Sequence, residues 1–355
     1  MKVIKIYEHC RFVSGYRRGI IYDLDKEKYF YIPNILCEIA NKFDKKSLAD
    51  IIKFYGKENE NHINNYVNYL IENNFAFFDN YQNIKNYLPL NLNWEQPYQI
   101  TNAIIDIDSN SKFNFENILY QFDEIGCNHI QIRSYIQLSI KEIINIVKFS
   151  NNSAIKTIDL IVKFNGTPEK YASIFEEDNR INSLIFHTSP DDKVIIKTEF
   201  NNVIISTIKK EIKSPVDFQI IDPAFFNVNL PLYTESMHFN AYYNRKIAID
   251  SNGNIKNCTA HNKSFGNISN NYLIDVINKN EFQYIWNVKK DKIKVCKDCE
   301  HRYMCIDSRL PKLKNNSWYY ETECNYNPYI AKWQSDDGYY TVKNWFKINK
   351  QIIPK

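Results

Sequence analysis

The sequence predicts an α/β protein that is built from more than one domain. After a linker that contains Pro89 and Pro97, near-continuous apolar runs alternate with stretches of helical period, the pattern of a parallel sheet with connecting helices. The first 80 residues combine two β-rich runs with three short helical patterns, and the last 120 residues hold five of the eight cysteines. We therefore expect domains at residues 1–80, 81–235 and 236–355.

The first domain is expected to contain a hairpin followed by three helices. Residues 19–25 and 28–33 are β-rich and are separated by a short acidic turn. Apolar residues recur at helical spacing in 35–43 and 63–71, and Ser47 with Asp50 forms a variant of the capping box at the start of the helix between them. The apolar run 75–78 is expected to end the domain as a strand or wing.

The middle domain is expected to be a parallel sheet or a partial (β/α) barrel. Ser139 and Glu142 form a capping box ahead of the clearest helix, 140–149, and a second helix is expected at 115–122. The expected strands are 100–107, 129–134, 157–164, 183–186 and 202–206, with a further candidate at 218–221. Cys127 stands alone before the second strand, where we expect a small buried residue.

Four cysteines near the C-terminus have the spacing C-x2-C-x5-C-x18-C. They are Cys296, Cys299, Cys305 and Cys324. Thiolates suit zinc or an iron–sulfur cluster, and the spacing alone leaves both metals open. Disulfides are a third interpretation. The opening MKVIKIYEHC has no apolar signal segment, so we expect a cytoplasmic protein with free thiols.

Composition excludes several classes of function. The 45 basic and 41 acidic residues leave a net charge of only +4, which gives no support for nucleic-acid binding. No apolar run reaches the length that spans a bilayer, so a membrane partner is not expected. No G-x-S-x-G, P-loop or H-E-x-x-H motif is present.

The C-terminal region resembles the SPASM domain, the auxiliary-cluster module of peptide-modifying radical SAM enzymes. Besides the four cysteines, the resemblance rests on the run 245–258, with Gly253 and Cys258 in a G-x4-C pattern, and on the FGNI of 265–268. It covers roughly residues 236–330 and implies one 4Fe–4S cluster on the four cysteines, with zinc as the alternative. Cys258, with His261 or His238, would be the remnant of a second site.

The order of elements in residues 1–80 resembles the winged-helix-type recognition element that captures leader peptides of ribosomally made, modified peptides. In that family the leader peptide adds as a strand at the sheet edge beside the third helix. The resemblance implies peptide-binding residues in 28–32 and in the third helix, namely Tyr29, Tyr31, Tyr66 and Tyr69. A small packing domain without a ligand is the alternative.

The middle domain resembles the radical SAM barrel, but its chemistry is not conserved in the sequence. That family binds S-adenosylmethionine at a cluster held by a CxxxCxxC loop after the first strand, and the corresponding loop here, 106–117, contains no cysteine. We therefore expect no residues that bind S-adenosylmethionine and no conventional radical SAM enzyme.

The whole chain resembles the SPASM-type maturase of grasp-with-spasm systems. This resemblance implies an accessory maturase that binds a precursor peptide and works with an ATP-grasp ligase to make a cross-linked peptide. The alternatives are a catalytic iron–sulfur redox enzyme of the radical SAM/SPASM superfamily and a zinc-containing nucleic-acid-binding regulator.

Overall fold

The computed structural model describes residues 1–151, 153–197, 204–218, 221 and 223–349. The chain forms two compact units, each made of separate segments. Unit 1 comprises residues 1–94, 221–241 and 288–355, and unit 2 comprises 95–220 and 242–287. Unit 1 thus contains both the N-terminal region and the four clustered cysteines. The three domains expected from the sequence remain a proposal.

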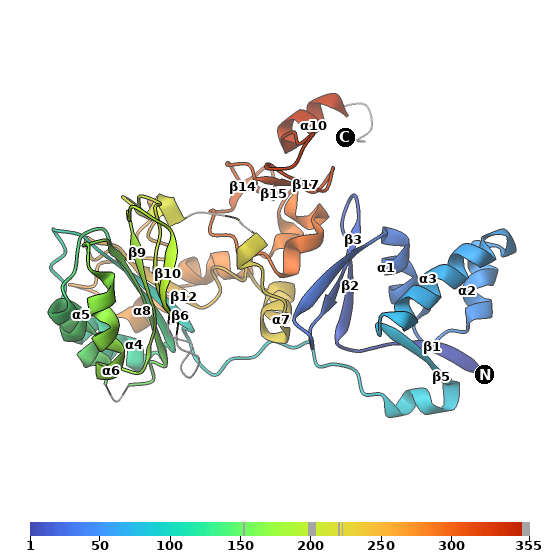
Figure 1. Ribbon diagram of the computed structural model, residues 1–355, viewed down its shortest axis with the longest axis horizontal. Helices are drawn as coiled ribbons and strands as arrows, with labels where there is room; N and C mark the ends of the chain where they lie inside the picture. Colours follow the sequence, from blue (N-terminus) through green and yellow to red (C-terminus); the bar gives the residue numbers. More distant parts are fainter. Residues whose placement is uncertain (152, 198–203, 219–220, 222, 350–355) are drawn as a thin grey trace. The chain divides into compact units, whose positions relative to one another are not determined.

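The N-terminal part of unit 1 contains two small sheets and three helices (Figure 1). One antiparallel sheet has the order β2-β3-β4, and a second pairs β1 with β5. The elements are β1 (Lys2–Ile6), β2 (Cys10–Ser14), β3 (Gly19–Asp23), β4 (Lys28–Ile32), α1 (Asn34–Phe43), α2 (Leu48–Tyr55), α3 (Glu60–Glu72) and β5 (Ala76–Asn80). The hairpin, the three helices and the final strand were predicted, whereas β1 and β2 were not.

Alternation along β3 packs both faces of its sheet. Ile21 belongs to the apolar core beneath α1, α2 and α3, while Ile20 and Tyr22 point to the opposite face, because successive strand residues alternate. On that second face they pack with Tyr233 of α7 (Leu230–His238) and with Met304, the residue directly before Cys305. The cysteine-bearing segment therefore rests directly on the N-terminal sheet.

Unit 2 is built on an eight-stranded sheet of order β10-β11-β9-β8-β7-β6-β12-β13, in which the run from β11 to β12 is parallel. This confirms the predicted α/β class with a large, mostly parallel sheet. Its strands are β6 (Asn102–Ile107), β7 (His129–Ser134), β8 (Thr157–Lys163), β9 (Ile181–His187), β10 (Lys193–Lys197), β11 (Ile204–Thr207), β12 (Lys246–Ile249) and β13 (Ile255–Lys256).

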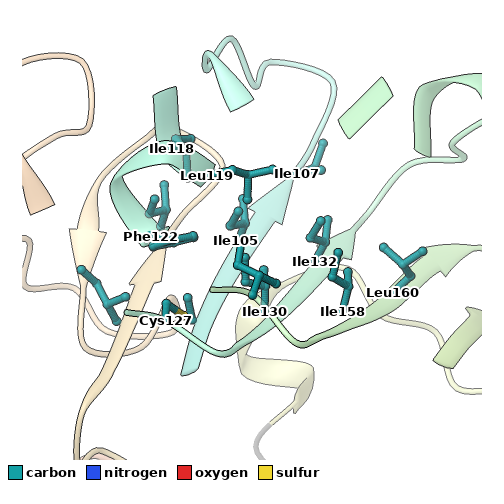
Figure 2. Close-up of a cluster of buried hydrophobic side chains, with 14 of the residues drawn as sticks. Ile105, Ile107, Ile118, Leu119, Phe122, Cys127, Ile130, Ile132, Ile158 and Leu160 are labelled. Atoms are coloured by element: carbon teal, nitrogen blue, oxygen red, sulfur yellow. The ribbon is translucent and has the colours of Figure 1, made fainter. Parts of the chain in front are cut away.

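The core of unit 2 lies between this sheet and its connecting helices. Figure 2 shows Ile105 of β6 and Ile130 of β7 close to Phe122 of α4 (Phe115–Glu124), all fully buried. Cys127 is buried in the same cluster, as expected. The helices of this unit are α4, α5 (Ile140–Val147), α6 (Ile174–Glu177), α8 (Leu273–Ile277) and α9 (Asn280–Gln283).

Both predicted capping boxes are present. Ser47 accepts a hydrogen bond from the backbone N–H of Asp50, and the Asp50 carboxylate accepts one from the Ser47 backbone N–H. Ser139 and Glu142 make the same reciprocal pair at the start of α5. Each pair satisfies backbone donors that a helix end leaves open.

Two predicted strands need comment. The strand expected at 202–206 corresponds to β11, and residues 202–203 lie outside the described residues. Of the candidate strand 218–221, Phe218 ends a short 3-10 turn, Pro215–Phe218, and residues 219–220 lie outside the described residues. Strand β10 was not predicted.

The C-terminal part of unit 1 is made of short elements: β14 (Lys312–Lys314), β15 (Ser317–Tyr319), β16 (Tyr326–Asn327), β17 (Lys332–Trp333) and α10 (Val342–Ile348). Such short strands cannot bury a large core, and modules of this kind commonly depend on a metal or disulfides. All eight cysteines of the chain carry free thiols. Among the described residues, no helix combines the length and apolar character needed to cross a bilayer.

Candidate metal centre

The four cysteines of the C-x2-C-x5-C-x18-C pattern line one cavity of about 30 Å³. Cys296 begins a 3-10 turn, Cys296–Asp298, and the Cys299 backbone N–H donates to the Cys296 carbonyl at 3.0 Å. Cys305 follows a second turn, Glu300–Tyr303, and its N–H donates to the His301 carbonyl at 3.0 Å. Cys324 lies just before β16. The structure therefore brings together the four residues that the spacing singled out.

The backbone at the entrance to this turn is strained. Val295, directly before Cys296, has φ +70° and ψ −51°. A β-branched side chain rarely adopts positive φ, and such conformations persist where surrounding structure imposes them, often at functional sites. The strain marks the cysteine turn as a conformation that its environment enforces.

The sulfur atoms are spread around the cavity. No three of the four lie within 4.8 Å of one another, although all four cysteines are among the described residues. A single tetrahedral zinc ion with Zn–S bonds of about 2.3 Å would hold every pair of sulfurs about 3.8 Å apart. In an iron–sulfur cluster each thiolate binds a different iron atom, which suits a wider arrangement.

Burial disfavours free thiolates at this site. It raises the pKa of Cys296 to about 12 and that of Cys305 to about 11, and it also raises the pKa values of Cys299 and Cys324. Without a metal these groups are thus neutral thiols at pH 7. A bound metal would displace their protons, so metal affinity should depend on pH.

Three cations, Arg302, Lys290 and Arg309, line the same cavity. Lys290 and Arg309 line it together with Asp307, whose carboxylate lies 3.4 Å from the Lys290 Nζ and 2.7 Å from an Arg309 nitrogen. Four thiolates outweigh the positive charge of a zinc ion or of an iron–sulfur core, so a loaded site is anionic. The soft donor set and the surrounding positive charge therefore fit such a group.

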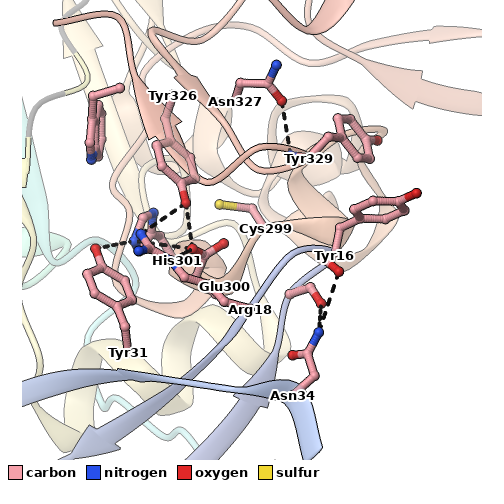
Figure 3. A network of polar contacts seen from close by, with 12 residues as sticks. Tyr16, Arg18, Tyr31, Asn34, Cys299, Glu300, His301, Tyr326, Asn327 and Tyr329 are labelled. Carbon is pink, nitrogen blue, oxygen red and sulfur yellow. Dashed lines mark hydrogen bonds and ion pairs between the residues drawn. The ribbon is translucent and has the colours of Figure 1, made fainter. Parts of the chain in front are cut away.

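A polar network beside Cys299 links Glu300 and His301 to the N-terminal sheet (Figure 3). The fully buried Glu300 carboxylate accepts from Arg18 Nε at 2.7 Å and from the Tyr326 hydroxyl at 2.5 Å. The Arg18 guanidinium lies 3.4 Å from the centre of the Tyr31 ring. No local sequence pattern indicates this network, because its members lie up to 308 residues apart.

The Tyr31 hydroxyl continues this network to His301, whose Nε2 is 2.8 Å away. Burial lowers the pKa of His301 to about 3, so the imidazole is neutral at pH 7. Strand β4 thereby contacts the residue two positions after Cys299.

The four tyrosines expected to bind a peptide do not share one face of the N-terminal domain. Tyr29 and Tyr31 point to the sheet face that meets the cysteine-bearing segment. Tyr66 and Tyr69 of α3 are half-buried against the core on the opposite face. Tyr69 and Phe30 each pack on Phe75, with ring centres 6.2 and 5.1 Å away. That face is where β4 and α3 meet.

None of the three additional candidate ligands is among the residues that line the cysteine cavity. His238 ends α7 and its Nε2 lies 3.0 Å from the Leu92 carbonyl oxygen. Cys258 and His261 belong to unit 2, where the Tyr242 hydroxyl is 3.6 Å from the Cys258 sulfur and the Tyr243 hydroxyl is 2.8 Å from His261 Nε2. Their role as ligands remains a prediction.

A buried ion pair occupies the carboxyl edge of the parallel sheet in unit 2. Asp106 near the end of β6 accepts from Arg133 Nε of β7 at 2.7 Å and from the Tyr135 hydroxyl at 2.7 Å. The other end of the Arg133 guanidinium donates to Thr259 and lies 4.0 Å from the centre of the Phe218 ring. Ligands commonly bind at this edge in open parallel sheets. Here these side chains satisfy one another.

Comparison with protein families gives a match to one domain model. Residues 242–300 match the family model of SPASM, an iron–sulfur cluster-binding domain. The matched stretch includes Cys258, Cys296 and Cys299, and it ends before Cys305 and Cys324. No curated protein matches the chain.

Three crystal structures that are similar to this chain are of SuiB from Streptococcus suis. The complex with S-adenosylmethionine has a TM-score of 0.35 and 14% identity, and the alignment covers 86% of this chain and 95% of SuiB. SuiB alone gives a TM-score of 0.33, with 13% identity and coverage of 85% and 94%. SuiB bound to the precursor peptide SuiA gives a TM-score of 0.27, with the same identity and coverage.

Proposed function

We propose that this chain is a peptide-maturation protein that carries one iron–sulfur cluster on Cys296, Cys299, Cys305 and Cys324. The observation that carries the proposal is the coincidence of two findings: the SPASM match over 242–300, and the convergence of the four thiols on one cavity. The separation of the sulfur atoms favours a 4Fe–4S cluster over the alternative, zinc.

The cluster's first role in this proposal is structural. The segment after residue 288 has only short strands, and binding of a metal group by four cysteines would tie its turns together. Once bound, a cluster can also accept and donate an electron. The residues of this chain hold it, exclude water from the buried sulfurs and surround it with charge.

The proposed peptide partner is a ribosomal precursor peptide, bound through its leader. Among the described strands β4 pairs only with β3, so its other edge is available to a further strand. Phe30 and Tyr69 pack on the buried Phe75 where β4 and α3 meet, and these two half-buried rings would bind side chains of the added strand.

An ATP-grasp ligase is the proposed enzyme partner, which would cross-link the core of the bound peptide. Binding the leader on this chain would raise the effective concentration of the core peptide at the ligase. The chain's own part in this scheme is presentation of the substrate, and the ligase supplies the ATP-dependent bond formation.

Fluorescence anisotropy with labelled synthetic candidates for the leader peptide tests the peptide proposal. We expect saturable binding that survives moderate salt and that weakens about tenfold in Tyr69→Ala, equivalent to about 1.4 kcal/mol. Tyr120→Ala is the control, because Tyr120 is an exposed tyrosine on α4 of unit 2. Equal binding by both variants, or no binding by the native chain, would contradict the proposal.

A second assay tests the ligase partnership. The native chain should increase the yield of cross-linked precursor when it is mixed with the proposed ATP-grasp ligase and ATP, as measured by the mass loss of each condensation. A ligase that makes the same product at the same rate without the chain would exclude the presentation role.

A further inference from the structure

Lys290 is a buried cation whose ammonium has no hydrogen-bond acceptor among the described residues. Its side chain is 8% exposed, and its Nζ approaches the Asp307 carboxylate at 3.4 Å without forming a hydrogen bond. The same side chain lines the cavity of the four cysteines. An ammonium has three donors, and leaving them unsatisfied in a buried site is costly, so the arrangement points to an acceptor in the cavity.

The charges around the cavity give the same indication. Asp307 is the carboxylate with which both Lys290 and Arg309 form ion pairs, and the Arg309 guanidinium holds it by two hydrogen bonds at 2.7 and 3.0 Å. One carboxylate compensates one of the two cations. The third cation that lines the cavity, Arg302, has a carboxylate of its own, Asp291, at 3.4 Å, so one positive charge is left beside the four cysteines.

An anionic metal–thiolate group would remove this imbalance. Its sulfur atoms are hydrogen-bond acceptors. It would also place negative charge next to the Lys290 ammonium, which lacks a hydrogen-bond acceptor among the described residues. Hydrogen bonds and charges next to the ligands of a metal site fix its affinity and, in iron–sulfur sites, its reduction potential.

We propose that Lys290 is a positioning residue that donates a charge-assisted hydrogen bond to a sulfur atom of the bound metal group, and thereby strengthens metal binding and raises the reduction potential. This inference rests on the proposed metal site and adds a residue outside the cysteine pattern. Its rival is a purely structural role for Lys290, in which the ion pair with Asp307 is its whole contribution.

The test compares Lys290→Met with two matched variants of the full chain, purified without oxygen. Lys294→Met removes the same charge from an exposed lysine two residues before Cys296. Lys290→Arg keeps the buried charge. The readouts are the rate of metal release to a chelator and the midpoint potential from a titration followed by electron paramagnetic resonance.

We expect Lys290→Met to release metal about tenfold faster than Lys294→Met and to have a lower midpoint potential, because a nearby positive charge stabilises the reduced, more negative cluster. Lys290→Arg should recover most of both properties. Loss of the cluster from Lys290→Met, with the cluster retained in Lys294→Met and Lys290→Arg, would also support the inference.

Identical release rates and potentials in Lys290→Met and Lys294→Met would overturn it, as would loss of metal in Lys290→Arg equal to that in Lys290→Met. If the native chain contains zinc, the iron–sulfur proposal fails separately. The release rate then decides the role of Lys290 by itself.

Discussion

Replacing Arg18 by Met tests how the N-terminal sheet is held to the cysteine-bearing segment. Arg18 lies between β2 and β3 and donates to the Glu300 carboxylate at 2.7 Å. The Glu300 side chain is fully buried and that of Arg18 is 28% exposed. The substitution would leave the buried Glu300 carboxylate with the Tyr326 hydroxyl as its hydrogen-bond donor.

The expected loss of stability follows from this geometry. Removing one partner of a buried ion pair costs about 3–5 kcal/mol, because the other charge stays buried without compensation. Arg18 is partly exposed, so water can enter the vacated space, and we expect a loss near the lower end, about 3 kcal/mol. For a unit of this size that corresponds to a fall in melting temperature of roughly 6–12 °C.

Urea unfolding followed by tryptophan fluorescence measures this loss of stability in unit 1. Four of the five tryptophans, Trp94, Trp318, Trp333 and Trp345, belong to unit 1. The neighbouring Arg17 is exposed, so Arg17→Met should stay within about 0.5 kcal/mol of the native chain. If Arg18→Met is equally mild, the Arg18–Glu300 pair does not stabilise unit 1 and our account of this network is wrong.

Three further predictions concern the metal, a helix end and pH. Cys305→Ser should lose metal and lower the melting temperature of unit 1, whereas Cys127→Ser, in the core of unit 2, should keep full metal content. Elemental analysis distinguishes the two variants. An unchanged metal content in Cys305→Ser would exclude Cys305 from the ligands. Ser139→Ala removes the N-cap of α5 and should cost about 1 kcal/mol in urea unfolding, and no change would mean that this capping box contributes nothing. Burial lowers the pKa of His187, so as pH falls below about 6.5 the unfolded chain binds a proton here before the folded chain does. The contribution of neutral His187 to the free energy of unfolding should therefore be fully present above that pH and be lost below it, by at most about 1.4 kcal/mol per pH unit. The fall should be shallower in His187→Asn than in the exposed-histidine control His62→Asn. Parallel pH profiles for these two variants would contradict the assignment.

Local chemistry explains which parts of the fold could be predicted. Capping boxes at Ser47 and Ser139 are complete within four residues. The apolar runs of β6, β7 and β8 are recognisable because these strands are buried in the core of unit 2. Strands β1, β2 and β10 were missed. Strand β1, for instance, depends on pairing with β5, whose residues are 70 to 78 positions away, and no local pattern reveals that partner.

The metal centre could be predicted only as far as its ligands. Cysteine spacing revealed the four thiols, because a turn places Cys296 and Cys299 next to each other whatever surrounds them. Lys290 and Glu300 look like ordinary surface charges in the sequence. Their burial arises from tertiary packing, on the cysteine cavity for Lys290 and against Arg18 for Glu300.

Metal analysis with an absorption spectrum, on protein purified without oxygen, tests the central claim most directly. The account predicts about four irons and four sulfides per chain with a broad brown absorption band, all lost in Cys305→Ser. About one zinc per chain and a colourless solution, or a folded chain without any metal, would contradict the assignment of an iron–sulfur cluster to these four cysteines.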